Sequence, residues 1–128
     1  MNKIKTTIQD IKIVKEIYFI TLKINEQYIN ILNFNINNKI KIGDIVYITI
    51  KSTNIALSKN LPEDISITNR LNAKIIDINN GEILTAIKLD IDGFILESII
   101  TTKAYLDMNL NIDDKIIALI KSNEITIC

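Results

Sequence analysis

The sequence predicts an all-β protein built as two tandem OB-like five-stranded barrels, with one short helix in the second. The first observation behind this prediction is a duplication, because residues 50–57 return as residues 120–127 and residues 2–8 return as residues 69–75. The copies lie about 65 to 70 residues apart, and such a spacing predicts one small unit used twice. The second observation is an alternation of apolar and polar residues at period two, which is typical of half-buried strands.

Residues 1–60 form the first predicted unit. Within it Ile20, Leu22 and Ile24 fall on one face of a strand, while Thr21 and Lys23 fall on the other. A β-branched residue such as isoleucine suits this pleated, half-buried surface. Strands are expected over residues 3–14, 17–24, 27–33, 45–51 and 54–58. The dipeptide Gly43-Asp44 predicts a turn before the fourth of them.

A short connector over residues 59–64 joins the copies. Pro62 has no amide hydrogen and pushes the preceding residue towards extended geometry, so this segment is not the interior of a strand. Its shortness predicts that the two units pack closely.

Residues 61–128 form the second predicted unit and repeat the strand order of the first. Hairpin turns are predicted at Asn79-Asn80-Gly81 and at Asp92-Gly93. Strands are expected over residues 69–78, 82–91, 94–100, 115–121 and 124–127.

One helix is predicted over residues 102–108, where the pattern changes from alternating to helical, with Thr102 as its N-cap. The first copy has nothing as helical between Phe34 and Lys39, so it is the abbreviated copy. Five short strands with a helix between the third and fourth favour an OB-like barrel. Periodicity alone leaves another small β barrel or a sandwich open.

Length and charge limit the partners. Each half is near 60 residues and would bury only about 60% of its unfolded surface, so the halves are expected to pack on each other or on another chain. The 128 residues carry 15 basic and 15 acidic side chains, and this zero net charge argues against a nucleic-acid partner. The aromatic side chains are expected in the core or at its rim rather than as a stacking platform for bases: Tyr18, Phe19, Tyr28, Tyr47, Phe94 and Tyr105.

The residue types present also argue against an enzyme. There is no histidine, and Cys128 is the one cysteine, so a disulfide within the chain and a zinc site of the Cys and His type are both excluded. Asp77, Asp90 and Asp92 lie in hairpin surroundings that favour solvated turns over a catalytic carboxylate pair. No apolar run reaches the length of a membrane span and no signal-peptide segment opens the chain, so a cytoplasmic protein is expected.

The second copy resembles the TOBE or Mop domains, the molybdate-binding units of molybdate-responsive regulators, molbindins and molybdate-importer ATPases. Its opening string is Ser66-Ile67-Thr68-Asn69-Arg70-Leu71, its middle holds the Ile100-Thr101 step and the short helix, and its closing string is Ala118-Leu119-Ile120-Lys121-Ser122. Thr68 stands where the family usually has arginine. The first copy is more loosely similar, and the pair resembles the tandem at the C-terminus of importer ATPases, although no Walker motif is present.

The resemblance implies that the ligand is a tetrahedral oxyanion, molybdate or tungstate, held by hydrogen-bond donors with no metal ligand from the protein and no organic cofactor. The donors it implies are Ser66, Thr68, Asn69, Thr101, Lys121 and Ser122 of the second copy, and Lys51 and Ser52 of the first. A lysine ammonium and rotatable hydroxyls suit such an anion. Because the second copy holds the fuller motif, we expect Lys121 to contribute more to binding than Lys51.

The free energy that anion binding requires predicts an oligomer. Micromolar affinity requires about 8 kcal/mol, whereas charged hydrogen bonds contribute about 1.5–3 kcal/mol each and neutral ones about 1 kcal/mol. One lysine and a few hydroxyls fall short once association entropy is subtracted, so a dimer or trimer that pools donors is expected. The function implied is intracellular molybdenum homeostasis, storage or regulation of transport, with a molybdate ABC importer as a partner. The alternative is a non-enzymatic OB-like interaction module, with oligonucleotide binding less favoured.

Overall fold

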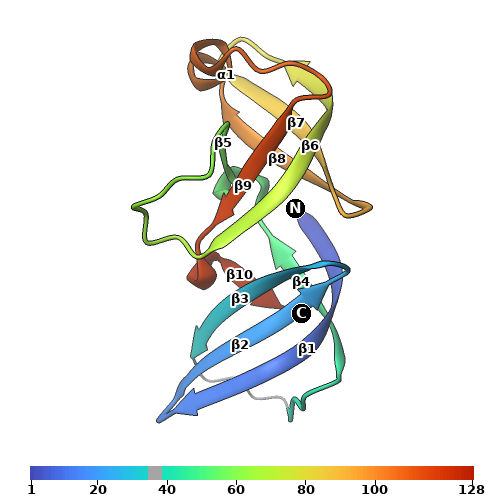
Figure 1. Ribbon diagram of the computed structural model, residues 1–128, viewed down its shortest axis with the longest axis vertical. Coiled ribbons are helices and arrows are strands. Elements are labelled where there is room, and N and C mark those ends of the chain that lie inside the picture. The colour runs from blue at the N-terminus through green and yellow to red at the C-terminus, as the bar shows by residue number, and fades with distance from the viewer. Residues whose placement is uncertain (35–38) are drawn as a thin grey trace.

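The computed structural model describes residues 1–34 and 39–128, and it confirms the all-β architecture. In the described part of the chain two curled five-stranded sheets lie end to end along the long axis of the molecule (Figure 1). The first sheet is built mainly from the N-terminal half and the second mainly from the C-terminal half. The predicted pair of OB-like units with one helix is therefore correct.

The strands follow the predicted order in both halves. The first half comprises β1 (Asn2–Val14), β2 (Ile17–Ile24), β3 (Gln27–Phe34), β4 (Ile45–Ile50), the 3-10 turn η1 (Ser52–Asn54) and β5 (Ala56–Ser58). The second half comprises β6 (Asn69–Asn80), β7 (Leu84–Ile91), β8 (Phe94–Thr101), α1 (Thr102–Met108), β9 (Lys115–Ile120), the 3-10 turn η2 (Ser122–Glu124) and β10 (Ile125–Ile127). The predicted fourth strands ran one residue too far, and the predicted fifth strands began too early, because a 3-10 turn separates them.

The two halves exchange their last strands. The strand order is β10-β4-β1-β2-β3 in the first sheet and β5-β9-β6-β7-β8 in the second. Ile125 of β10 pairs with Ile50, and Ala56 of β5 pairs with Leu119. Figure 1 shows the red β10 in the lower sheet and the green β5 in the upper one. Each sheet therefore contains residues from both halves of the sequence, and neither sheet is complete without the other half.

The duplication predicted from the sequence is also present in the strand register. Asn2 lies opposite Ile50 in the β1–β4 pair, and Asn69 lies opposite Ile120 in the β6–β9 pair. The long first strand of each half shifts register at the same place, between Ile8 and Asp10 in β1 and between Ile75 and Asp77 in β6. Equivalent positions therefore differ by 67 residues in the first three strands and by 70 in the fourth.

The core consists of isoleucine and leucine from the inner faces of both sheets. Each fully buried side chain of this kind contributes about 1.5–3 kcal/mol relative to an exposed one. The buried set includes Ile4, Ile8, Ile20, Leu22, Ile48 and Ile50 from the first half and Leu71, Ile75, Ile87, Leu89, Ile116 and Ile120 from the second. The apolar positions of the period-two pattern are therefore the positions that the fold buries.

The helix α1 occupies the predicted residues, but its N-cap is Thr101 rather than Thr102. The Thr101 hydroxyl accepts a hydrogen bond from the Ala104 amide at 3.1 Å. The prediction was one residue off because β8 continues to Thr101, which places Thr102 inside the helix. The buried Thr102 hydroxyl instead lies 2.8 Å from the Thr85 hydroxyl and donates to the Gly81 carbonyl at 2.8 Å.

The helix is closed by Asn109, whose φ of 51° is left-handed. On the exposed side of the helix, the Asp107 carboxylate accepts from Lys103 at 2.9 Å and raises the pKa of that lysine above its usual value.

The shortened middle predicted for the first copy falls on residues 35–38, which lie outside the described residues. The connector at residues 59–64 contains no strand, as predicted. No helix in the described part of the chain is long and apolar enough to cross a membrane.

Candidate functional site

Two asparagines join the halves where the sheets meet. The side chain of Asn69, which is 1% exposed, accepts from the Asn30 amide at 2.7 Å and donates to the Asn30 carbonyl at 2.8 Å. Asn2 makes the equivalent pair with Glu97, at 2.7 and 2.8 Å. The side-chain amide of each asparagine thus forms the two hydrogen bonds that a paired strand residue would form with the edge strand of the other sheet, β3 or β8. The Asn69 amide, predicted as an oxyanion donor, already has these partners.

The predicted lysines occupy equivalent positions at the start of the two 3-10 turns. Lys51 has φ −67° and ψ 135°, and Lys121 has φ −68° and ψ 138°. Both are exposed, and neither side chain caps its turn. The turn η1 packs on β8 of the second half, while η2 packs on β3 of the first half. The exchange of β5 and β10 therefore brings both lysines to the junction between the halves.

The two serines that follow these lysines have different surroundings. Ser52 is 6% exposed, and its hydroxyl has no hydrogen-bond partner among the described residues. Ser122 is half-buried, and its hydroxyl lies 3.5 Å from the Asn69 side-chain nitrogen. A buried hydroxyl without a partner costs about 1–3 kcal/mol. The Ser52 hydroxyl is therefore an unused donor among the described residues, but it is buried and lines neither groove at the junction.

A groove of about 480 Å³ brings two of the predicted ligands together. Thr101 at the end of β8 and Lys121 after β9 both line it, together with Thr53 of η1 and Ile67 before β6. The predicted donors Ser66 and Thr68 are exposed on either side of Ile67 in the sequence, but neither is among the residues that line this groove. Thr101 also caps α1 by accepting a hydrogen bond, which leaves its hydroxyl proton available to a ligand.

A smaller groove of about 260 Å³ contains Lys51. Thr49 and Thr126 supply hydroxyls there, and Asn54 and Glu124 line both this groove and the one beside Lys121. The two grooves therefore adjoin. Glu124, which corresponds to Asn54 of the first copy, places a carboxylate between the lysines and opposes any anion bound beside it.

Arg70 was not among the predicted site residues, although it lies within the opening string. Its guanidinium donates to the carbonyls of three residues between β5 and β6: Ile67 at 2.8 Å, Pro62 at 2.9 Å and Ile65 at 2.9 Å. It thereby fixes residues 62–67, which end at Ile67 in the groove. The sequence shows the arginine, but only the folded chain shows that three carbonyls converge on it.

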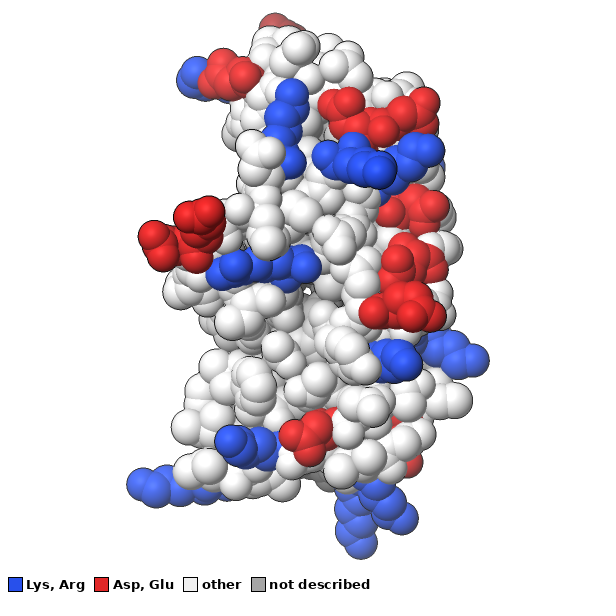
Figure 2. Space-filling view, in the orientation of Figure 1, with Lys and Arg blue, Asp and Glu red and all other residues white. Residues whose placement is uncertain are grey.

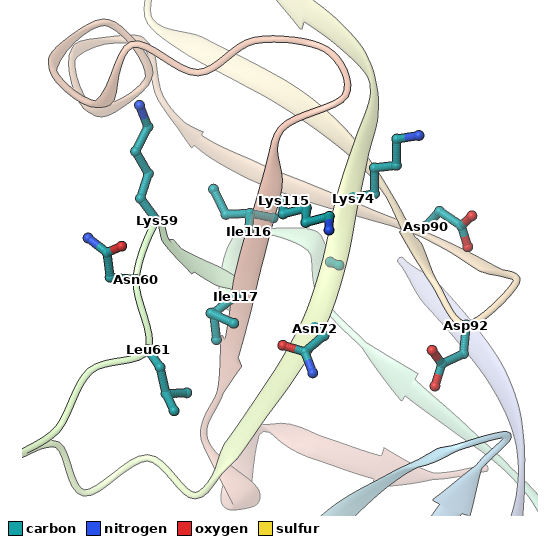
Figure 3. Close-up of a pocket in the computed structure, with 11 residues that line it drawn as sticks. Lys59, Asn60, Leu61, Asn72, Lys74, Asp90, Asp92, Lys115, Ile116 and Ile117 are labelled. Carbon is teal, nitrogen blue, oxygen red and sulfur yellow. The ribbon is translucent and has the colours of Figure 1, made fainter.

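A third groove, of about 690 Å³, contains none of the predicted ligands (Figure 3). Lys74 and Lys115 come from the neighbouring strands β6 and β9, and Asp90 and Asp92 come from the end of β7 and the turn after it. Lys74 also lies 3.5 Å from Asp113. Acidic and basic side chains thus offset each other here. Among the described residues, no group of three or more His, Cys, Asp or Glu could hold a metal ion.

Comparison with known proteins agrees with the fold. Residues 65–127 match the family model of the TOBE domain. A solved structure described as the cytoplasmic molybdate-binding protein ModG, with molybdate bound, superposes with a TM-score of 0.92 at 17% identity, covering 98% of this chain and 94% of that one. A molybdate-binding protein from Sporomusa ovata is 33% identical over 47% of this chain and 90% of its own, with a TM-score of 0.46. No curated protein sequence matches the chain.

The family match covers the half of the chain that carries the fuller motif, from the connector to β10. The superposition with ModG spans both halves, which shows that the first half shares the architecture of a two-unit protein. Residues 65–127 therefore match the TOBE domain family, and the chain as a whole shares the fold of the ModG structure.

Proposed function

We propose that this protein binds molybdate or tungstate in the adjoining grooves beside Lys51 and Lys121, and that it serves intracellular molybdenum storage or the regulation of molybdate transport. The observation that carries the proposal is the paired placement of these lysines at one junction, where Thr101 and Lys121 line one groove and Lys51 lines the adjoining one. The similarity in fold to a protein solved with molybdate bound supports it.

The chemistry of the grooves suits a tetrahedral dianion. Lys121 offers an ammonium group, and Thr101 and Thr53 offer hydroxyls in the same groove. Lys51 offers the equivalent charge in the adjoining groove, with Thr49 and Thr126 beside it. Each oxygen of the anion accepts hydrogen bonds, and rotatable hydroxyls adapt to its position. No organic cofactor and no catalytic step enter this function.

A single chain supplies too few donors for tight binding. One ammonium contributes about 1.5–3 kcal/mol and each hydroxyl about 1 kcal/mol, whereas micromolar affinity requires about 8 kcal/mol after the cost of association. Glu124 reduces the total further. We therefore infer that a homodimer or homotrimer brings donors from two chains to each anion. A molybdate ABC importer in the cytoplasmic membrane is the partner that a regulatory role would require.

Isothermal titration with molybdate, tungstate and sulfate tests the proposal directly. Reversible binding of the first two is expected, with sulfate much weaker because its smaller tetrahedron does not reach all donors at once. Native mass spectrometry of the same samples should show an oligomer and a fixed number of anions per oligomer. Lys103→Ala serves as the control, because this exposed lysine lies on α1 and lines neither groove. An absence of heat for molybdate and tungstate would refute the function.

A further inference from the structure

The outer face of the first sheet carries side chains that its inner face lacks. Residues alternate along β1 to β4, so that isoleucine and leucine point into the core and the intervening residues point outward. The outward set combines lysines with aromatic residues: Lys3, Lys5, Lys12, Lys23, Phe19, Tyr28, Phe34 and Tyr47. This set is called the aromatic–lysine face below.

The strand register places lysines directly beside aromatic rings on this face. Lys23 lies opposite Tyr28, and Lys5 lies opposite Tyr47. The Lys23 ammonium is 6.0 Å from the centre of the Tyr28 ring, and the Lys3 ammonium is 5.1 Å from the centre of the Tyr47 ring. Tyr28 is 52% exposed and Tyr47 is 44% exposed. Neither tyrosine therefore lies in the core, and both expose part of their surface to solvent.

The zero net charge of the chain is the sum of two unlike halves. Residues 1–60 hold nine lysines and four carboxylates, a net charge of +5. Residues 61–128 hold six basic and eleven acidic residues, a net charge of −5. Figure 2 shows acidic side chains gathered over the upper half of the molecule, which is the second half of the chain. The charge argument against a polyanionic partner therefore does not apply to the first half.

The lysines of the aromatic–lysine face are not neutralised by carboxylates. Within residues 1–34 and 39–128 the ion pairs are Lys74–Asp113 and Lys103–Asp107, and both belong to the second half. Asp10 is the one acidic residue among the outward positions of β1 to β4. The face thus presents four ammonium groups against one carboxylate.

The same positions in the second half show that the fold does not require this composition. The residues equivalent to the aromatic positions Phe19, Tyr28, Phe34 and Tyr47 are Ala86, Ile95, Thr101 and Ile117. The residues equivalent to Lys3, Lys5, Lys12 and Lys23 are Arg70, Asn72, Asn79 and Asp90. The two sheets share one backbone arrangement, so the rings and charges of the first are a property of its surface alone.

We propose that the aromatic–lysine face binds single-stranded nucleic acid. Exposed rings on the sheet of an OB-like unit give bases a surface on which to stack, and the lysines beside them contact phosphates. OB-like units that bind single strands in this way contact about 4–16 nucleotides each. Binding should have little sequence preference, because every base has a face that stacks on an aromatic ring.

A second copy of this chain fits the face less well. Lysine is depleted at the centre of stable protein interfaces, and a face with four lysines would repel its own copy. The outer face of the second sheet does not complement it either, because Arg70, Lys74, Lys88 and Lys115 lie there among Asp77, Asp90 and Glu97. Phosphate groups complement the charge of the face, and bases complement its rings.

Fluorescence anisotropy with the full chain tests the proposal. The probes are labelled oligothymidine and oligouridine of about 15 nucleotides, within the expected site size, and a duplex of the same length. Both single strands should bind, and the duplex should bind more weakly because its bases are already stacked. With up to four phosphate contacts, the logarithm of the association constant should fall against the logarithm of salt concentration with a slope of up to about −2.8.

Variants in matched pairs separate this face from general charge. Tyr28→Ala should weaken single-strand binding roughly 5- to 150-fold, and Lys23→Ala should make the salt slope less negative by about 0.7. Their controls are Ile95→Ala, at the equivalent position of the second sheet, and Lys88→Ala, an outward lysine there. Both controls should leave binding unchanged, and thermal melts establish that all four variants fold.

Three results would overturn the proposal. The first is an absence of binding by either single strand at low salt, and the second is an equal loss for the variants of the two sheets. The third is self-association in sedimentation experiments that Tyr28→Ala abolishes while no oligonucleotide binds, because the face would then be an interface between copies. Molybdate titrations of Tyr28→Ala should match those of the unaltered protein, so this proposal and the oxyanion proposal fail separately.

Discussion

The two halves of this protein share a backbone and differ in their surfaces. They agree in strand order, in the position of the register shift, and in the asparagine pairs that Asn2 and Asn69 make across the junction. They differ in net charge and in the rings of their outer faces. Core positions must fit a closely packed interior, whereas outward positions need only remain soluble. A duplicated unit can therefore keep its fold while its two outer faces diverge.

The same comparison holds within the proposed oxyanion site. Lys51 and Lys121 have nearly the same backbone angles, but the residues after them do not have the same surroundings. Ser52 is buried and has no hydrogen-bond partner within residues 1–34 and 39–128, whereas Ser122 contacts Asn69. The repeat in sequence therefore predicts two equivalent positions, and the packing around each makes them chemically different.

The largest expected effect concerns the exchanged strands. Ile125, at the start of β10, is buried in the first sheet, and its counterpart Ile55, just before β5, is buried as well. Ile125→Ala and Ile55→Ala should each lower the free energy of unfolding by about 2–5 kcal/mol. Urea denaturation followed by circular dichroism measures this loss. A single transition is expected, since each sheet needs both halves, and two separate transitions would show that the halves unfold independently.

Removing either asparagine of the junction should have the next largest effect. Asn69→Ala deprives the Asn30 amide and carbonyl of their partners, and Asn2→Ala does the same to Glu97. Each change should cost about 1–3 kcal/mol of stability. Thermal melts of both variants compare the two losses of stability. Similar losses would show that the two asparagines contribute equally to stability, as their equivalent hydrogen bonds predict. Losses that differ by more than about 1 kcal/mol would contradict it.

The lysines at the junction should affect ligand affinity rather than folding. Lys121→Ala should weaken molybdate binding by about 1.5–3 kcal/mol, roughly 10- to 150-fold. Lys51→Ala should cost less, because its groove is the smaller one. The melting temperature should change little in both, since exposed substitutions usually alter stability by less than about 0.5 kcal/mol. Equal and negligible losses in titration would mean that neither lysine contacts the anion.

The serines that follow the two lysines are expected to have only small effects on stability. Ser52→Ala removes a buried hydroxyl without a partner and should leave stability unchanged or raise it by up to about 1 kcal/mol. Ser122→Ala removes a 3.5 Å contact and should change stability by less than about 0.5 kcal/mol. Denaturation without molybdate measures whether the Ser52 hydroxyl stabilises the fold. Denaturation with molybdate measures whether it also stabilises the bound state. A marked loss of stability without ligand would show that its hydroxyl has a partner in the folded protein.

The sequence by itself determined the strands, the duplication and the inner faces. Ile20, Leu22 and Ile24 are buried as their alternation predicts, because the side-chain period of a strand is a local property of the backbone. The helix was also predicted at its place, and its N-cap was missed by one residue because the end of β8 depends on pairing with β7. Local patterns state which residues turn inward, but not where a paired strand stops.

Only the tertiary structure decided which sheet each last strand joins. Residues 55–57 and 125–127 are the equivalent segments of the repeat, so the sequence does not state which of them pairs with β4 and which with β9. In the fold, η1 packs on β8 and η2 packs on β3, and each last strand continues into the sheet of the opposite half. That choice brought Thr101 and Lys121 into one groove and Lys51 into the next. These contacts join residues far apart in the chain, and their energies depend on packing that no local pattern records.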